Sequence, residues 1–117
     1  MGAFQSVLAT PPQDRSNEHG GSGPIVFRRV LERTDFTAPV DFVDFTIVAP
    51  GSTIGRHRHV GTEEIYYIVA GSPLMRVGAH EARLHPGGLS VVRDGDTHEL
   101  INDTADAVEL LVIQVRT

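Results

Sequence analysis

The sequence contains no cysteine and no lysine, since all ten of its basic residues are arginines. Without cysteine the chain has no disulfide bond, no thiolate nucleophile and no sulfur ligand for a metal. Without lysine it cannot form a Schiff base with a carbonyl substrate. Any chemistry must therefore come from histidine, carboxylate, tyrosine, hydroxyl or arginine side chains, or from a bound metal.

Long apolar runs are also missing. The longest span four to six residues, as at 65–70, whereas a helix that crosses a bilayer needs roughly 20. The N-terminus shows no basic stretch followed by an apolar one, so we expect no secretory signal and a cytoplasmic location. The net charge of −5 argues against nucleic acid and membrane as partners, and we expect a small-molecule substrate instead.

The length of 117 residues fits one domain with a short extension. Residues 11–24 (PPQDRSNEHGGSGP) are proline, glycine and polar residues, which predict that residues 1–24 form a flexible N-terminal arm. The histidine of this arm, His19, is expected to be solvated; the alternative is that the arm folds over the mouth of a site. Residues 25–117 are predicted to form the folded domain.

After residue 24 the sequence changes to short, β-branched apolar runs that are separated by glycine, proline and aspartate. Many short strands at regular spacing predict an all-β sandwich or barrel. No segment keeps a helical period over eleven or more residues. The expected strands lie at 25–31, 42–49, 54–59, 64–70, 74–77, 82–84, 89–93, 99–102 and 108–115.

Four side chains in this region suggest a metal site. His57 and His59 are one residue apart, so on a strand both imidazoles lie on the same face. Glu64 opens the next predicted strand, and His98 follows an Asp-Gly-Asp turn before a later one. Three imidazoles and one carboxylate suit a borderline divalent metal such as Mn, Fe, Ni, Zn or Cu.

The spacing of these residues resembles the two sequence motifs of the cupin superfamily. The first stretch has glycine, a His-x-His pair, glutamate and glycine at Gly51, His57, His59, Glu64 and Gly71. The second stretch, which resembles the second cupin motif, has Gly87, Arg93, Gly95, His98 and Asn102. It departs from the family at Arg93, where cupins usually have a proline that shapes a loop, so the departure concerns the local turn.

The resemblance implies a single-domain cupin: a small antiparallel β-barrel, also called a jelly roll or double-stranded β-helix. It implies one divalent metal ion per chain (Fe, Mn, Ni or Zn), bound by His57, His59, Glu64 and His98, with water or substrate at the remaining positions. Glu63 competes with Glu64 as the ligand, and the six-residue gap to the next glycine favours Glu64. Cupins are often dimeric, so we expect a homodimer, with the strand at 25–31 as the edge that pairs or swaps.

Other side chains are candidates for contact with a substrate. Tyr66 shares the face of Glu64 by alternation, so it is either a catalytic proton donor inside the barrel or a core aromatic residue. Arg76 and Arg93 either bind a substrate carboxylate or form surface ion pairs. The cavity around the metal is expected to be largely apolar, lined by Leu74, Val91, Leu100, Leu110 and Val112.

Two functions are compatible with these features. The first is a metal-dependent enzyme, an oxygenase or an isomerase/cyclase, that acts on a small oxygenated metabolite with the assistance of Tyr66. The second is a binding or sensing module, in which the metal anchors an anionic small molecule without turnover. The resemblance alone does not choose between them, because one fold carries many functions.

Overall fold

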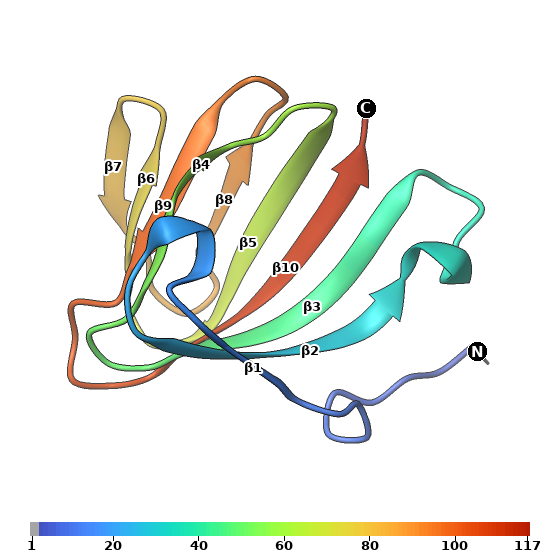
Figure 1. Cartoon of the computed structure of the whole chain (residues 1–117), viewed down its shortest axis with the longest axis horizontal. Coiled ribbons are helices and arrows are strands. Elements are labelled where there is room, and N and C mark those ends of the chain that lie inside the picture. Colours follow the sequence, from blue (N-terminus) through green and yellow to red (C-terminus); the bar gives the residue numbers. More distant parts are fainter. Residues whose placement is uncertain (1–2) are drawn as a thin grey trace.

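The computed structural model describes residues 3–117, which form an all-β antiparallel fold of two sheets (Figure 1). One sheet has six strands in the order β1 (Gln13–Ser16), β2 (Pro24–Glu32), β3 (Val40–Val48), β10 (Val108–Arg116), β5 (Thr62–Ala70) and β8 (Leu89–Val92). The other has four, in the order β4 (Thr53–Arg58), β9 (Thr97–Ile101), β6 (Leu74–Val77) and β7 (His80–Arg83). This arrangement confirms the predicted antiparallel jelly-roll fold.

All nine predicted strands are present, with ends that differ by up to two residues. The described part of the chain contains no α-helix and only two short 3-10 turns, η1 (Glu18–Gly20) and η2 (Arg33–Asp35). Within residues 3–117 no helix has the length and apolar character that crossing a membrane requires.

Strand β5 shows how the sequence pattern sets the two faces of the larger sheet. Its residues Glu64, Tyr66 and Ile68 are buried, whereas Ile65 and Tyr67 between them are exposed. Side chains that alternate across a strand explain this division. The inward face carries the functional candidates, and the outward face carries large apolar side chains that the chain itself leaves uncovered.

The core lies between the two sheets and is built from inward-facing residues of most strands. Burial of each such side chain stabilises the fold by about 1.5–3 kcal/mol relative to exposure. The core residues are Ile25, Val48, Ile54, Tyr66, Ile68, Met75, Leu100, Val108, Leu110 and Val112.

The N-terminal region differs from the predicted flexible arm. Residues 13–23, here called the N-terminal strap, contain strand β1, which pairs with β2, and turn η1, which contacts β4. The approach to β4 depends on two glycines: a Cβ at Gly21 would lie 2.6 Å from the Thr53 carbonyl oxygen, and one at Gly55 would collide with the His19 carbonyl oxygen. The sequence predicted a loop because Gln13–Ser16 shows no alternation of apolar and polar residues. The structure explains this, since all four residues of β1 are exposed.

The pairing of β1 with β2 also corrects the predicted sheet edge. Strand β2, expected at 25–31 as the edge, lies inside the sheet between β1 and β3, and β1 is the edge strand. In Figure 1 the strap (blue) runs from β1 along β2 and turns at η1 beside the smaller sheet.

Candidate metal centre and adjoining pocket

The four predicted metal ligands converge on one point. The Nε2 atom of His59 lies 3.2 Å from that of His57 and 3.0 Å from that of His98, and the last two are 3.0 Å apart. The Oε1 atom of Glu64 lies 3.4 Å from Nε2 of His59 and 3.2 Å from Nε2 of His98. All four donor atoms lie within 4.8 Å of one another.

Both sheets contribute to this cluster. His57 on β4 is the cross-strand partner of His98 on β9, so their side chains lie on the same face of the smaller sheet. His59 follows the end of β4 and is buried. Glu64 faces them from β5 of the larger sheet. Glu63, the alternative ligand, instead accepts a hydrogen bond from a backbone N–H in the turn after β8, and it is outside the cluster.

The second ring nitrogens of two histidines are held by hydrogen bonds that orient the first. Nδ1 of His57 lies 2.7 Å from the Gly55 carbonyl oxygen, and Nδ1 of His59 lies 2.9 Å from Thr62 Oγ1. A carbonyl only accepts, so Nδ1 of His57 carries the proton and its Nε2 presents a lone pair to the cluster. Nδ1 of His98 is buried and has no hydrogen-bond partner within the described chain.

The spacing of the donor atoms fits a metal ion. Two nitrogens bound to one ion at about 2.1 Å and at right angles lie about 3.0 Å apart, which matches the distances between the histidine Nε2 atoms. The Nε2 lone pair of His57 faces the other two Nε2 atoms, so a cation between them would be favourably placed. The residues therefore fit a divalent ion bound by His57, His59, Glu64 and His98.

The protonation states of the cluster also suit metal binding. Burial lowers the pKa of His57 to about 4, so its imidazole is neutral near pH 7, as a ligand must be. Burial also raises the pKa of Glu64, but the neighbouring His59 and His98 outweigh it and lower this pKa to about 2. Glu64 is therefore ionised and supplies the negative charge of the site.

Tyr66 lies on the side of the metal centre, as the alternation of β5 predicts. Its side chain is buried, and its ring centroid lies 4.6 Å from that of His98. Burial, together with the charge of Glu64, raises the pKa of Tyr66 well above its usual value. The phenol is therefore protonated, and it can donate a proton or a hydrogen bond.

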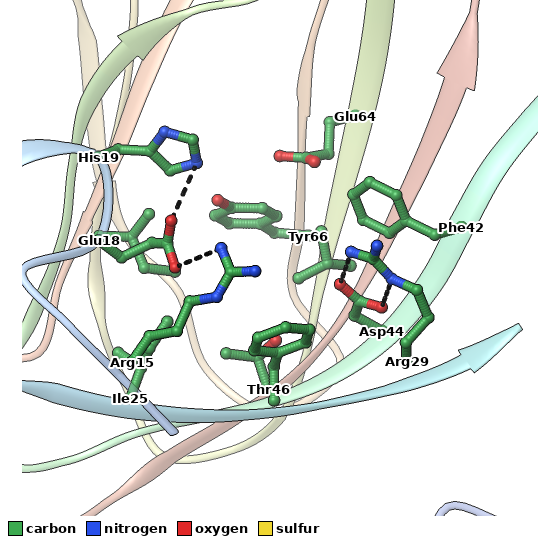
Figure 2. A pocket seen from close by; sticks show the side chains of 13 residues that line it. Arg15, Glu18, His19, Ile25, Arg29, Phe42, Asp44, Thr46, Glu64 and Tyr66 are labelled. Carbon is green, nitrogen blue, oxygen red and sulfur yellow. Dashed lines mark hydrogen bonds and ion pairs between the residues drawn. The ribbon is translucent and has the colours of Figure 1, made fainter. Parts of the chain in front are cut away.

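A cavity of about 110 Å³ adjoins the metal centre at Glu64 and Tyr66 (Figure 2). Its lining combines apolar side chains with charged side chains from the strap and from β2 and β3. The lining residues are Arg15, Glu18, His19, Ile25, Phe27, Arg29, Phe42, Asp44, Thr46, Ile54, Glu64, Tyr66 and Val112.

Of the five apolar residues that were predicted to line the cavity, only Val112 does so. Leu100 and Leu110 are fully buried in the core, where they pack between the sheets, and neither Leu74 nor Val91 lines this cavity. Alternation predicts which face a side chain occupies. It does not predict which inward side chains are covered by others.

The two arginines proposed from sequence as carboxylate ligands lie away from the cavity. Arg76 contacts Glu81 at 2.6 Å and Glu99 at 3.1 Å, which is the surface ion pair of the alternative interpretation. Arg93 is exposed in the turn after β8. Neither residue is among those that line the cavity.

Apart from Glu64, the charged residues that line the cavity were missed by the sequence interpretation. Asp44 is the clearest case, since it alternates with Thr46 and Val48 on the buried face of β3. A carboxylate at an inward strand position requires a partner, and Arg29 on β2 supplies it with two contacts of 3.0 Å. That inward aspartate was the signal in the sequence.

His19 is also at the site. Its ring stacks on that of His57, with centroids 3.7 Å apart and planes inclined by 12°. The neighbouring Glu18 and Arg15 line the cavity from the same strap. Of the two interpretations of His19, the structure therefore shows the one in which the N-terminal segment covers the site.

Comparison with known proteins identifies the family. Residues 44–114 match the Cupin domain family, and the chain therefore belongs to it. An oxalate-binding protein from Thermotoga maritima is 26% identical over 102 residues, which cover 87% of this chain and 84% of that protein. The tetracenomycin polyketide synthase protein TcmJ from Streptomyces glaucescens is 29% identical over 87 residues, 74% of this chain and 56% of that protein.

The fold is shared with solved structures. The crystal structure of a predicted oxalate decarboxylase from Thermotoga maritima superposes with a TM-score of 0.94 at 23% identity. The match covers 97% of this chain and 99% of that one. This likeness extends to the N-terminal strap as well as to the cupin motifs.

Proposed function

We propose that this cupin is a metal-dependent enzyme that acts on a small oxygenated metabolite, as an oxygenase or an isomerase/cyclase. The observation that supports this most directly is the position of Tyr66. Its protonated phenol and the ligand Glu64 line the same cavity, so a molecule in the cavity contacts both the proton donor and the metal centre.

A divalent ion held by the three histidines and Glu64 supplies Lewis acidity toward an oxygen of the substrate. The remaining functions belong to side chains of the chain itself. Tyr66 donates a proton or a hydrogen bond to the substrate, and burial of its ring fixes the direction of the phenol. The strap limits access of water, because its residues Glu18 and His19 form part of the cavity wall.

The charged side chains of the lining, two arginines among them, favour an oxygen-rich, acidic substrate over an apolar one. Two relatives agree with this interpretation. One is described as an oxalate-binding protein, and oxalate is a small dicarboxylate. The other is described as a polyketide synthase protein, and polyketides are oxygenated compounds. We therefore include small carboxylates and phenolic or enolic compounds in the substrate class.

A second function is favoured by the name of one relative. That relative is described as oxalate-binding. If this chain binds its ligand on the metal without turnover, it is a binding or sensing module. The two functions differ in whether the ligand leaves unchanged.

The test is to load purified protein with Mn, Fe, Ni or Zn and to incubate each form with a panel of small carboxylates and phenols. Reactions are run with and without oxygen and followed by mass spectrometry. We expect a new product that needs the metal. Product that also needs oxygen indicates an oxygenase, and an isomeric product indicates an isomerase or cyclase. Ligands that bind and return unchanged across the whole panel would replace the enzyme with the binding module.

We also propose that the protein is a homodimer that uses the outward face of β5 and β8. Apolar side chains gather there: Ile65, Tyr67, Val69 and Leu89 are 36%, 39%, 42% and 54% exposed. Tyr67 and Leu89 are cross-strand partners, so the exposed surface is continuous. Contiguous apolar surface of this kind is characteristic of protein interfaces, and a second copy presents the same face.

A further inference from the structure

Two arginines line the cavity beside the metal centre, and only one of them is fully engaged within the chain. Arg29 donates from Nε and Nη2 to the two carboxylate oxygens of Asp44, each at 3.0 Å. This two-point pairing uses the edge of the guanidinium that a carboxylate recognises. Arg29 therefore neutralises the inward Asp44, and the edge of its guanidinium that would recognise a ligand carboxylate is already occupied.

Arg15 has a different environment. Its carboxylate partner within the described chain is Glu18, and that contact, Nη1 to Oε2, is 3.4 Å long, at the limit of a hydrogen bond. The side chain is 51% exposed, although its residue lines the cavity. A guanidinium has five N–H donors. Most of those of Arg15 are therefore free to bind a ligand.

The fold holds Arg15 toward the cavity. Its partner across the β1–β2 pair is Ile25, which is buried and lines the same cavity, and directly opposite residues face the same side of a sheet. The guanidinium lies 4.6 Å from the centroid of the Phe27 ring, which supports its plane. Figure 2 shows this group pointing into the cavity toward Tyr66, beside Glu18.

Glu18 does not prevent an anion from binding to Arg15. Its other carboxylate oxygen, Oε1, lies 3.7 Å from Nε2 of His19, so Glu18 keeps a partner when Arg15 turns to a ligand. The remaining carboxylates of the lining are Asp44, paired with Arg29, and Glu64, which belongs to the metal centre. Arg15 is thus the cation of the lining that can exchange its partner.

We infer that Arg15 binds one carboxylate of the substrate at the strap side of the cavity, while a second carboxylate of the same molecule reaches the metal centre. The inference rests on the proposed function and narrows its substrate class to small dicarboxylates. Arg15 is then a specificity-determining residue, contributed by a segment outside the two cupin motifs.

The experiment compares wild-type protein with Arg15→Gln, Arg15→Lys and the control Arg93→Gln, each loaded with the same metal. Dissociation constants are measured by calorimetry for oxalate, malonate and succinate. They are also measured for glycolate, 3-hydroxypropionate and 4-hydroxybutyrate, in which a hydroxyl replaces one carboxylate. Elemental analysis confirms that all four proteins hold the metal.

We expect Arg15→Gln to lower the affinity for the best-bound dicarboxylate about 10- to 100-fold, the loss typical of charge-assisted hydrogen bonds. The affinity for the matching hydroxy acid should change by less than about threefold, because its single carboxylate goes to the metal centre and leaves only a neutral hydroxyl at Arg15. Arg15→Lys should restore part of the affinity, since it keeps the charge but not the planar fork. Arg93→Gln should behave as wild type, because Arg93 is exposed in a turn away from the cavity.

The inference is overturned if Arg15→Gln binds dicarboxylates as tightly as wild type. It is overturned as well if the variant loses affinity for dicarboxylates and for hydroxy acids by the same factor. It is also overturned if wild type binds no dicarboxylate more tightly than its hydroxy acid. These results are separate from those on turnover. If Arg15→Gln selectively loses affinity for dicarboxylates but no protein forms product, the Arg15 site is supported and the enzyme is not. If turnover occurs and Arg15→Gln leaves it unchanged, the enzyme is supported and the Arg15 site is not.

Discussion

The imidazole ring of His19 lies flat against that of His57, with centroids 3.7 Å apart and an angle of 12° between the planes. One ring belongs to the strap and the other to the metal centre. His19 has a positive φ of 51°, and Asn17 has one of 56°. Such a backbone angle costs about 1–2 kcal/mol at His19, whereas asparagine adopts it more readily. Surrounding contacts therefore hold the strap in a strained conformation over the site.

The first prediction concerns the contact that holds the strap. Gly55→Ala should displace the strap from β4, because the added Cβ would collide with the His19 carbonyl oxygen and lie 2.8 Å from the Gly20 carbonyl carbon. We expect a loss of about 1–3 kcal/mol of unfolding free energy, which is typical of overpacking. Hydrogen exchange of the strap amides should become faster, whereas strands β5 and β10 should keep their protection.

A second variant checks the same contact from the other side. Gly21→Ala places its Cβ 2.6 Å from Thr53 Oγ1 and should loosen the same amides. Unchanged exchange in both variants would show that the strap does not depend on this close approach.

The second prediction concerns the metal ligands. His98→Ala should reduce metal content to near background, because it removes a buried donor at the centre of the cluster and leaves Glu64 with one fewer partner. The matched control is His80→Ala, which alters an exposed histidine at the start of β7. Elemental analysis of protein purified without chelators measures both. Full metal stoichiometry in His98→Ala would make the ligand assignment wrong.

The third prediction concerns Tyr66. Tyr66→Phe should keep the metal and the fold but lower turnover by about 10²–10⁴-fold, the usual effect of losing an acid–base group. In a binding module the same change would weaken ligand affinity by only about 0.5–1.5 kcal/mol. Tyr67→Phe is the control, since Tyr67 is the next residue on β5 and points outward. Equal turnover in the two variants would remove Tyr66 from the mechanism.

Most of the metal centre could be predicted from the sequence because its residues depend on local rules. His57 and His59 share a strand face, and Glu64 and Tyr66 do so on the next strand, so alternation places both pairs. The spacing of the cupin motifs adds His98. These relationships need no knowledge of how the sheets are covered.

The wall of the cavity could not be predicted in the same way, because it depends on contacts between distant segments. Arg15 reaches the cavity only because a short, exposed strand pairs with β2, and nothing in its polar sequence marks a strand. His19 reaches His57 only because Gly21 and Gly55 allow two backbones to approach closely. A glycine in a sequence does not show what lies against it.

The fourth prediction concerns acid stability away from the metal site. Burial alone would raise the pKa of Asp41, but hydrogen bonds from Gln114, Arg116 and Arg33 outweigh it and lower this pKa to about 2. A pKa below the unfolded value means that Asp41 stabilises the fold above about pH 4 and loses this contribution as the pH falls through about 2.

Asp41→Asn should therefore be less stable than wild type at pH 6, by about 1 kcal/mol after solvent screening. The difference should shrink between about pH 4 and pH 2 as the wild-type carboxylate is protonated. Urea unfolding of both proteins, in chelator, measures it. Asp14→Asn serves as the control, since Asp14 is exposed and forms no ion pair within residues 3–117. A difference that is constant with pH would contradict the assigned role of Asp41.

The last prediction concerns the proposed homodimer. Wild-type protein at micromolar concentration should show twice the mass of one chain by light scattering. Tyr67→Glu combined with Leu89→Glu should produce a monomer, because two carboxylates on cross-strand partners would have to be buried in the interface. Both side chains point away from the metal centre, so metal content should not change.

The control for the dimer separates the face of β5 and β8 from other exposed apolar groups. Phe4 and Leu8 are 94% and 86% exposed but lie before the strap, so Phe4→Glu with Leu8→Glu adds the same charge elsewhere and should leave the dimer intact. A monomeric wild type would remove the proposed dimer. A dimer that survives Tyr67→Glu with Leu89→Glu would place the interface elsewhere, with the edge strand β1 as the next surface to alter, because its outer backbone groups have no neighbouring strand in the sheet.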